Sequence, residues 1–302
     1  AGFDFELPTA PPSPAPPSSM QRRLGAIRTG AALARRGLCS KSKPAPEASP
    51  LIINFKHDGV ASISLNNRPV NALSHGVCLE LRAAIKELEA DGATRGLILG
   101  SALPNLFSGG LDIRAFHRPD LEQLTQYWTS VQELWLALHT TRLATVAAIS
   151  GHAPAGGCLL ALSCDHRVMV SGGYGIGLNE AQLGITAPPW FSQLLADRIG
   201  ARRAERMLMT GQLFSPDEAL AAGLVDDVVS LADLNNVASS RLAELLAVNE
   251  RGRVSIKKQL REPAAEALRE RQSEDLDWFI HVVQQEDVQA ALGAYIESLR
   301  KK

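Results

Sequence analysis

The stretch TVAAISGHAPAGGCLLALSCDHRVMV, residues 145–170, decides the fold. Its first part, Thr145–Ile149, is apolar and partly β-branched, which favours a buried strand. Gly156-Gly157 then opens an apolar run that predicts a helix through Leu162. His166–Val170 predicts a second buried strand. A strand, a glycine-rich turn, a helix and another strand in so short a stretch indicate an α/β fold with parallel strands.

Strand and helix patterns also alternate on the N-terminal side of this stretch. The patterns predict two strands, 51–55 and 60–65, joined at His57-Asp58-Gly59. A helix over 77–88, a third strand over 97–99 and a longer helix over 121–138 are expected to follow. The apolar stripe of the longer helix is Leu121, Leu124, Trp128, Val131, Trp135 and Leu138. After Pro188 the pattern becomes mostly helical. One terminal helix is expected to present the apolar face Leu276, Phe279, Ile280, Val283, Val288, Leu292, Tyr295, Ile296 and Leu299.

Composition and charge argue against several classes of protein. The 302 residues carry a formal net charge of −1, and 45% of them are hydrophobic, which is typical of a globular protein. The near-zero charge argues against nucleic-acid binding. No run reaches the roughly 18 apolar residues that a membrane span needs. The cysteines match neither a zinc site nor a disulfide framework; they are Cys39, Cys78, Cys158 and Cys164.

Residues 1–50 are interpreted as a leader that precedes the fold. Residues 1–19 are dominated by Pro, Ala and Ser, and residues 20–43 carry several Arg and Lys but no Asp or Glu. An Arg-rich, acid-free segment with apolar residues near helical spacing is typical of a mitochondrial transit peptide. We therefore expect Met20 to be the biological start and the mature protein to lie in the mitochondrial matrix. A disordered basic tail is the alternative.

The run IGLNEAQLGI, residues 176–185, contains a single carboxylate. Glu180 is the only charged residue between Arg167 and Asp197. Apolar surroundings remove solvent from a carboxylate and raise its pKa, which makes it a better proton carrier near neutral pH. A surface glutamate on an apolar turn is the alternative, because Glu is mostly exposed.

Two glycine-rich turns precede Glu180 in the chain. FSGGLD, at 107–112, follows a predicted strand, and GHAPAGGC, at 151–158, lies between a strand and a helix. Paired glycines allow a ligand to approach the backbone closely, and a helix N-terminus presents unpaired N–H groups. Two such N–H groups converging on one point would form an oxyanion hole. The alternative is two tight turns that glycine simply permits.

Several common catalytic motifs are absent from the sequence. It contains no phosphate-binding G-x-x-x-x-G-K-[ST], no G-x-G-x-x-G after a strand, no G-x-S-x-G elbow and no H-E-x-x-H. His152 is the histidine nearest a candidate site, and loop packing is favoured for it over a chemical role.

The three motifs resemble those of a known superfamily. FSGGLD at 107–112, PAGGC at 154–158 followed by Cys164-Asp165, and NEAQLG at 179–184 occur in order. On these residues the chain, from about Leu51 to its end, resembles the crotonase (enoyl-CoA hydratase/isomerase) superfamily. The resemblance implies an α/β fold with two parts: a spiral of ββα turns, and a C-terminal helical segment that drives formation of a homotrimer. In this chain those parts would be residues 51–245 and 246–302.

The resemblance also implies roles for individual residues. The substrate would be an acyl-CoA thioester, with no separate cofactor because coenzyme A belongs to the substrate. The thioester oxygen would lie between the N–H groups of Gly109 and Gly156, although the family more often has Ala at the position of Gly109. Glu180 would be the acid–base group. The remaining expected substrate contacts are Gly110, Leu111, Asp112, Ile113 and Asn179.

Leu159 bears on the reaction type. By the resemblance, hydratases of the family carry a second glutamate at this position. Adding water requires groups that position and activate it, whereas moving a proton between two carbons requires one carrier and a dry site. We therefore expect an isomerase of fatty-acid β-oxidation that converts 3-enoyl-CoA to trans-2-enoyl-CoA, with Glu180 moving a proton from C2 to C4. The alternatives are an enoyl-CoA hydratase or another crotonase-type enzyme, a thioester hydrolase, and a non-catalytic RNA-associated or scaffold protein.

Overall fold

The computed structural model describes residues 49–55 and 58–300. The expectations for the leader, including the transit segment at 20–43, lie outside the described residues. Within the described ranges the strands form two sheets, a six-stranded sheet of order β1-β2-β3-β5-β7-β9 and a three-stranded sheet of order β4-β6-β8. No helix in this part of the chain is long and apolar enough to cross a membrane.

The large sheet is almost entirely parallel. Only the first pair, β1 and β2, is antiparallel, as the predicted hairpin requires; the other neighbouring strands run parallel. The strands are β1 (Leu51–Phe55), β2 (Val60–Leu65), β3 (Gly96–Ser101), β5 (Ala144–Ile149), β7 (His166–Val170) and β9 (Asp227–Val229).

Three successive chain segments repeat one ββα pattern. Each places a strand in the large sheet, the next strand in the small sheet, and then a helical element. The small-sheet strands are β4 (Asn105–Leu106), β6 (Gly151–Pro154) and β8 (Ile176–Gly177). The helical elements that follow them are η1 (Ile113–Phe116) with α3 (Leu121–Thr140), α4 (Gly156–Ser163), and η2 (Glu180–Leu183) with α5 (Pro189–Ile199). The predicted spiral of ββα turns is confirmed.

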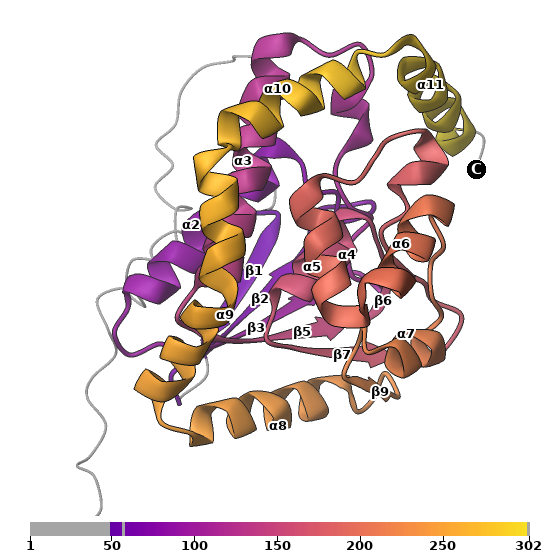
Figure 1. Ribbon diagram of the computed structural model, residues 1–302. Coiled ribbons are helices and arrows are strands. Elements are labelled where there is room, and N and C mark those ends of the chain that lie inside the picture. Colours follow the sequence, from indigo (N-terminus) through magenta and orange to yellow (C-terminus); the bar gives the residue numbers. More distant parts are fainter. Residues whose placement is uncertain (1–48, 56–57, 301–302) are drawn as a thin grey trace, which may run out of the picture. The chain divides into compact units, whose positions relative to one another are not determined.

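Helices cover both sides of the large sheet. On one face α8 (Leu234–Ala247) packs against β3, β5 and β7 (Figure 1). Its buried residues join an apolar cluster with the strands: Leu234, Ala238 and Leu242 against Ile98, Val146, Ala148, Val168 and Val170. Elsewhere α3 contacts α2, α9 and α10. The other helices are α2 (His75–Ala90), α6 (Ala201–Thr210), α7 (Pro216–Ala222), α9 (Glu250–Glu270), α10 (Gln272–Val283) and α11 (Glu286–Arg300).

The predictions for α2 and α3 are confirmed, with one difference in α3. In α2 the predicted stripe of Val77, Leu81, Ile85 and Leu88 is buried. In α3 the predicted stripe is buried except for Leu121, which is 47% exposed. Leu121 is the first residue of the helix, next to the N-cap Asp120.

The C-terminal apolar stretch differs from the prediction because it forms two helices. Helix α10 ends at Val283 and α11 begins at Glu286. The Val283 carbonyl accepts a hydrogen bond from the Gln289 side chain at 2.7 Å, so a side chain takes the place of a helical N–H. The predicted boundary between residues 245 and 246 falls in the last turn of α8 and stays a prediction.

Gly157 provides a test of this packing. A Cβ added there would lie 2.6 Å from the backbone carbonyl oxygen of Ser108. We expect Gly157→Ala to lower the free energy of unfolding by about 2–4 kcal/mol. Gly76→Ala is the matched control, because nothing lies within 4 Å of a Cβ at this helical position; it should gain up to about 1 kcal/mol. Urea unfolding of both variants measures the difference, and equal stabilities would contradict the packing.

Candidate active site

The small sheet brings the three sequence motifs to one edge. Strand β4 leads into the turn at 107–112, β6 into the turn at 154–158, and β8 into the segment at 179–184. The three strands are parallel to one another. Because the carboxyl ends of parallel strands lie at the same edge of a sheet, both glycine turns and Glu180 emerge side by side.

Backbone hydrogen bonds fix the two turns to each other and to β8. Phe107 N–H donates to the His152 carbonyl at 2.9 Å, and Ala155 N–H donates to the Gly177 carbonyl at 2.7 Å. The strands β4 and β6 approach each other closely, because a Cβ at Gly151 would overlap the carbonyl group of its partner Asn105. Glycine is therefore required there for the close approach of two backbones.

Two unpaired backbone N–H groups border one space at this edge. Gly156 is the first residue of α4, and its helix has no side-chain cap, so its N–H has no intrahelical partner. The Leu111 N–H likewise makes no hydrogen bond to any described residue. A Cβ added at Gly156 would lie 3.2 Å from the Leu111 nitrogen, and one added at Gly110 would lie 3.1 Å from the Gly156 nitrogen. Leu111 and Gly156 thus offer a pair of neighbouring donors.

The structure differs from the expectation at Gly109. Its N–H donates to the Val70 carbonyl oxygen at 2.8 Å, so this donor is already occupied. Of the two expected oxyanion donors, only Gly156 is unpaired among the described residues. Sequence reasoning could not have found Leu111 instead, because which amide remains free depends on the distant Val70 carbonyl.

Polar side chains buried under the first turn hold it in place. Ser108 Oγ donates to the Asn71 carbonyl at 2.8 Å and accepts from Gly110 N–H at 3.1 Å. The Tyr127 hydroxyl donates to the Leu73 carbonyl and accepts from Asp112 N–H at 2.8 Å. Tyr127 lies within the apolar helix α3, so its sequence position carried no signal of this role.

The second turn contains a strained residue. Ala155, immediately before Gly156, has φ = 48° and ψ = −120°, a conformation that residues with a Cβ rarely adopt. Such strain costs of order 1–3 kcal/mol and concentrates at functional sites. Here it directs the chain from β6 into α4 so that the Gly156 N–H faces the first turn.

Glu180 begins the short helix η2, against which α6 and α11 pack. The Gln182 side chain donates to the Gly211 carbonyl at 2.8 Å and fixes η2 to the end of α6. Part of the Glu180 residue is accessible, but its Oε2 is enclosed and no described residue donates to it. Burial raises the pKa of Glu180 to about 7, against a smaller opposing effect of its own backbone N–H. The enclosed Oε2 argues against the alternative of a freely exposed surface glutamate.

Cys158, on α4, lies near this carboxylate. Burial and, second, the charge of Glu180 raise the pKa of the Cys158 thiol, which places Glu180 near the first turn of α4. Leu159 is 3% exposed and follows Cys158 directly. The structure thus has a buried apolar side chain at the position where, by the resemblance, hydratases carry a second glutamate.

The other predicted site residues differ in whether their side chains are free to contact a substrate. Leu111 and Ile113 are half-buried and remain candidates for contact with an acyl chain. Asp112 instead caps η1 and pairs with Arg114 at 2.8 Å, so its carboxylate is already used. Asn179 precedes η2 without a side-chain cap. His152 accepts from Gly175 N–H at 3.1 Å, in agreement with loop packing.

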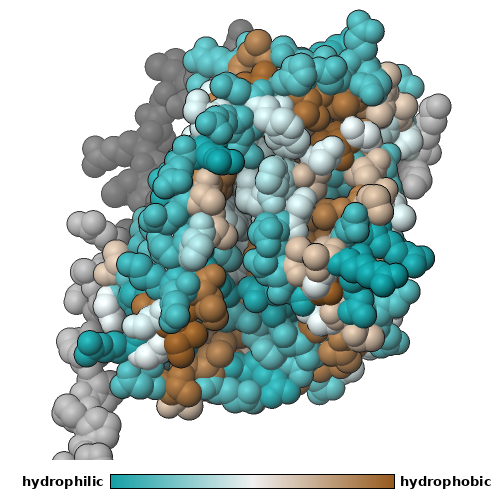
Figure 2. Space-filling model, in the orientation of Figure 1, coloured by the Kyte–Doolittle hydropathy of each residue, from teal (hydrophilic) through white to brown (hydrophobic). Residues whose placement is uncertain are grey.

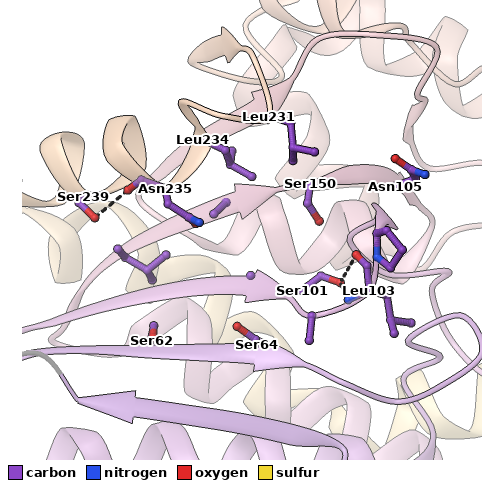
Figure 3. Close-up of a pocket in the computed structure, with 15 residues that line it drawn as sticks. Ser62, Ser64, Ser101, Leu103, Asn105, Ser150, Leu231, Leu234, Asn235 and Ser239 are labelled. Carbon is purple, nitrogen blue, oxygen red and sulfur yellow. Dashed lines mark hydrogen bonds between the residues drawn. The ribbon is translucent and has the colours of Figure 1, made fainter.

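A cavity of 540 Å³ lies away from these residues, between the large sheet and α8. Figure 3 shows Ser62 and Ser64 of β2 on one side of it and Leu234 and Asn235 of α8 on the other. It contains none of the predicted site residues and no charged side chain. Within residues 49–55 and 58–300, no group of three or more His, Cys, Asp or Glu is arranged to hold a metal ion.

Comparison with known proteins points to one family. The profile of the Enoyl-CoA hydratase/isomerase family matches residues 56–302. The mouse protein named enoyl-CoA delta isomerase 1, mitochondrial, is 39% identical over 282 residues, which cover 93% of this chain and 97% of the mouse protein. The human protein of the same name is 40% identical over 81% of each chain. The crystal structure of human mitochondrial delta3-delta2-enoyl-CoA isomerase matches with a TM-score of 0.83 and 39% identity, over 84% of this chain and 99% of that one.

The raised pKa of Glu180 predicts a pH-dependent stability difference. Below about pH 4.5 the side chain is protonated in both the folded and unfolded chain. Between pH 4.5 and about 7 the unfolded chain loses this proton while the folded chain keeps it, so stability falls as pH rises. Relative to Glu180→Gln, the native chain should lose up to about 3 kcal/mol across this range, with no further change above it. A difference that stays constant from pH 4 to 8 in urea unfolding would contradict the assignment.

Proposed function

The chain belongs to the enoyl-CoA hydratase/isomerase family, and we propose that it moves the double bond of a 3-enoyl-CoA to give the trans-2-enoyl-CoA. One observation carries this proposal. An enclosed carboxylate whose pKa is raised to about 7 emerges at the same edge of the small sheet as two backbone N–H groups that have no partner among the described residues. The fold is shared with a delta3-delta2-enoyl-CoA isomerase. The named isomerase relatives align along most of the chain.

The proposed mechanism uses Glu180 as a base and then as an acid. Its carboxylate removes a proton from C2, next to the thioester carbonyl, and the electron pair moves onto the carbonyl oxygen to form a dienolate. The N–H groups of Gly156 and Leu111 donate to that oxygen. Glu180 then returns the proton to C4, and the double bond forms between C2 and C3. Gly109 could join the oxyanion hole only if its hydrogen bond to Val70 opened.

The expected free-energy contributions of the donors, the raised pKa of Glu180 and the positioning of the substrate are consistent with this mechanism. Two preorganised donors contribute about 3–4 kcal/mol each to stabilising the dienolate. A Glu180 pKa of about 7 in place of 4.5 makes the carboxylate a stronger base by about 3 kcal/mol. Placing C2 and C4 within reach of one carboxylate supplies much of the remainder.

Leu159 supports isomerisation over hydration. Hydration would need a group that holds and activates water, and a buried leucine offers neither a donor nor an acceptor. It also adds no charged or polar group next to Cys158, whose thiol senses the charge of Glu180. A proton taken from C2 is then retained for delivery to C4.

We also propose where the protein acts in the cell and how its copies assemble. The relatives are named as mitochondrial, and we place this protein in the mitochondrial matrix, where it would act on acyl-CoA substrates. We also propose a homotrimer. On α11, Tyr295 and Leu299 are 42% and 49% exposed, and association would cover such apolar side chains.

Substitution of Glu180 tests the mechanism. Glu180→Gln keeps the size of the side chain but removes the base, so kcat with 3-enoyl-CoA should fall by about 10²- to 10⁴-fold, with KM little changed. Glu205→Gln, an exposed glutamate on α6, is the matched control and should retain full activity. Near-normal turnover by a folded Glu180→Gln variant would refute the assignment.

Substitution of Leu159 tests the reaction type. The unmodified enzyme should convert 3-enoyl-CoA and show little hydration of 2-enoyl-CoA. Leu159→Glu introduces a second carboxylate able to bind water, so hydration of 2-enoyl-CoA should rise at least about tenfold while isomerisation falls. The 3-hydroxyacyl-CoA product can be measured by chromatography. Substantial hydration by the unmodified enzyme would favour the hydratase alternative instead.

A further inference from the structure

A second cavity, which we call the α5–α9 cavity, lies apart from the site around Glu180. Its volume is 520 Å³, and α3, α5 and α9 supply most of its walls. None of its lining residues belongs to the motifs at 107–112, 154–158 or 179–184. The proposed isomerase mechanism therefore makes no use of it.

The lining of this cavity carries more positive than negative charge. Four cationic side chains line it, Arg198, Arg253, Lys257 and Arg261, against two carboxylates, Asp165 and Asp197. Lys257 and Arg261 both pair with Asp165, at 2.9 and 2.8 Å. Arg198 and Arg253 have no carboxylate partner among the described residues; each donates to a backbone carbonyl, at 3.5 and 3.1 Å.

Unused hydrogen-bonding atoms concentrate at the same cavity. Among the described residues, six buried side-chain nitrogen or oxygen atoms lack a partner, and four of them belong to residues that line it. They are Trp135 Nε1, His139 Nδ1, Arg198 Nε and Arg253 Nε. Trp135 and His139 are only 2% and 3% exposed. Buried polar atoms without partners are rare in folded proteins. Three of these four, Trp135 Nε1 and the two arginine Nε atoms, can only donate, so their collection at one cavity points to a missing acceptor.

The pKa values of two lining residues show, after the effect of burial, the effect of the neighbouring positive charges. Burial, and then the charges of Arg167 and Arg261, lower the pKa of Arg198 to about 10. Burial and the charges of Arg261, Arg198 and Lys257 lower the pKa of His139 to about 3, so this histidine is neutral. An anion in the cavity would oppose the part of each shift that the positive charges cause.

We infer that the α5–α9 cavity binds a phosphate group, held by Arg198 and Arg253. A guanidinium offers several N–H donors in a plane that matches a phosphate face. Trp135 Nε1 adds a neutral donor, and the oxygens of a phosphate can accept from several donors at once. The phosphate could belong to free inorganic phosphate or to a phosphate ester, including coenzyme A itself.

The surface around the cavity leaves room for such a group to enter. Ile256 and Leu260, which line its mouth on α9, are 60% and 74% exposed. Figure 2 shows this face of the molecule, where a hydrophobic strip borders hydrophilic surface between α9 and α5. A phosphate bearing an apolar substituent would fit this combination of charged floor and apolar rim.

Calorimetric titration with inorganic phosphate tests the inference, in buffer matched with sodium chloride for ionic strength. The unmodified protein should bind phosphate, and the double variant Arg198→Gln/Arg253→Gln should lose at least about tenfold in affinity. Arg251→Gln, an exposed arginine on α9 outside the lining, is the control and should bind normally. If the double variant does not fold, Arg198→Lys keeps the charge without the planar donor pair and should also weaken binding.

The KM for acyl-CoA distinguishes the two sources of phosphate. If free phosphate is the ligand, the double variant keeps the KM of the unmodified enzyme; if coenzyme A reaches the cavity, its KM rises while that of Arg251→Gln does not. A raised KM supports the phosphate site directly, and an unchanged KM supports it when the titration shows that phosphate binds. The inference is overturned if phosphate does not bind and KM is unchanged. It is also overturned if the double variant forms smaller oligomers in light scattering without any phosphate effect, because the cavity would then be a contact between copies.

Discussion

Parallel pairing of three very short strands, β4, β6 and β8, is the constraint on which the site depends. Each strand has only two to four residues, yet each ends where one of the three motifs begins. The pairing requires the backbones at Gly151 and Asn105 to touch, and glycine makes that contact possible. The large sheet and the helices supply stability around this pairing, and the small sheet sets the position of the reacting groups.

The proposed proton transfer depends on the few polar groups near the two glycine turns that have no hydrogen-bond partner. Most polar groups near the two turns are satisfied: Ser108, Tyr127 and Gly109 all have partners. The Gly156 and Leu111 N–H groups and Glu180 Oε2 have no partner in the part of the chain that the structure describes. Unpaired buried groups cost stability, and here they face a region where a thioester would place a developing negative charge beside a proton to be moved. The strain at Ala155 belongs to the same arrangement.

The sequence predicted the large elements well because long apolar patterns carry their own signal. Thr145–Ile149, Val77–Leu88 and the isolation of Glu180 were all readable from residue type and spacing. The small sheet was not, since strands of two to four residues show no periodicity, and β9 was missed for the same reason. The break after Val283 and the occupied Gly109 N–H depend on partners far away in the chain, Gln289 and Val70, which no local pattern reveals.

The most direct test of the account is a titration of the Glu180 carboxyl group itself. Carbon-13 NMR of protein labelled at the glutamate carboxyl carbon, compared with the Glu180→Gln variant, identifies its signal and follows it with pH. The account predicts a midpoint of about 7, because the carboxylate is enclosed and no described donor reaches Oε2. A midpoint near 4.5, the value for an exposed glutamate, would show that water reaches the carboxylate and would contradict a single buried proton carrier.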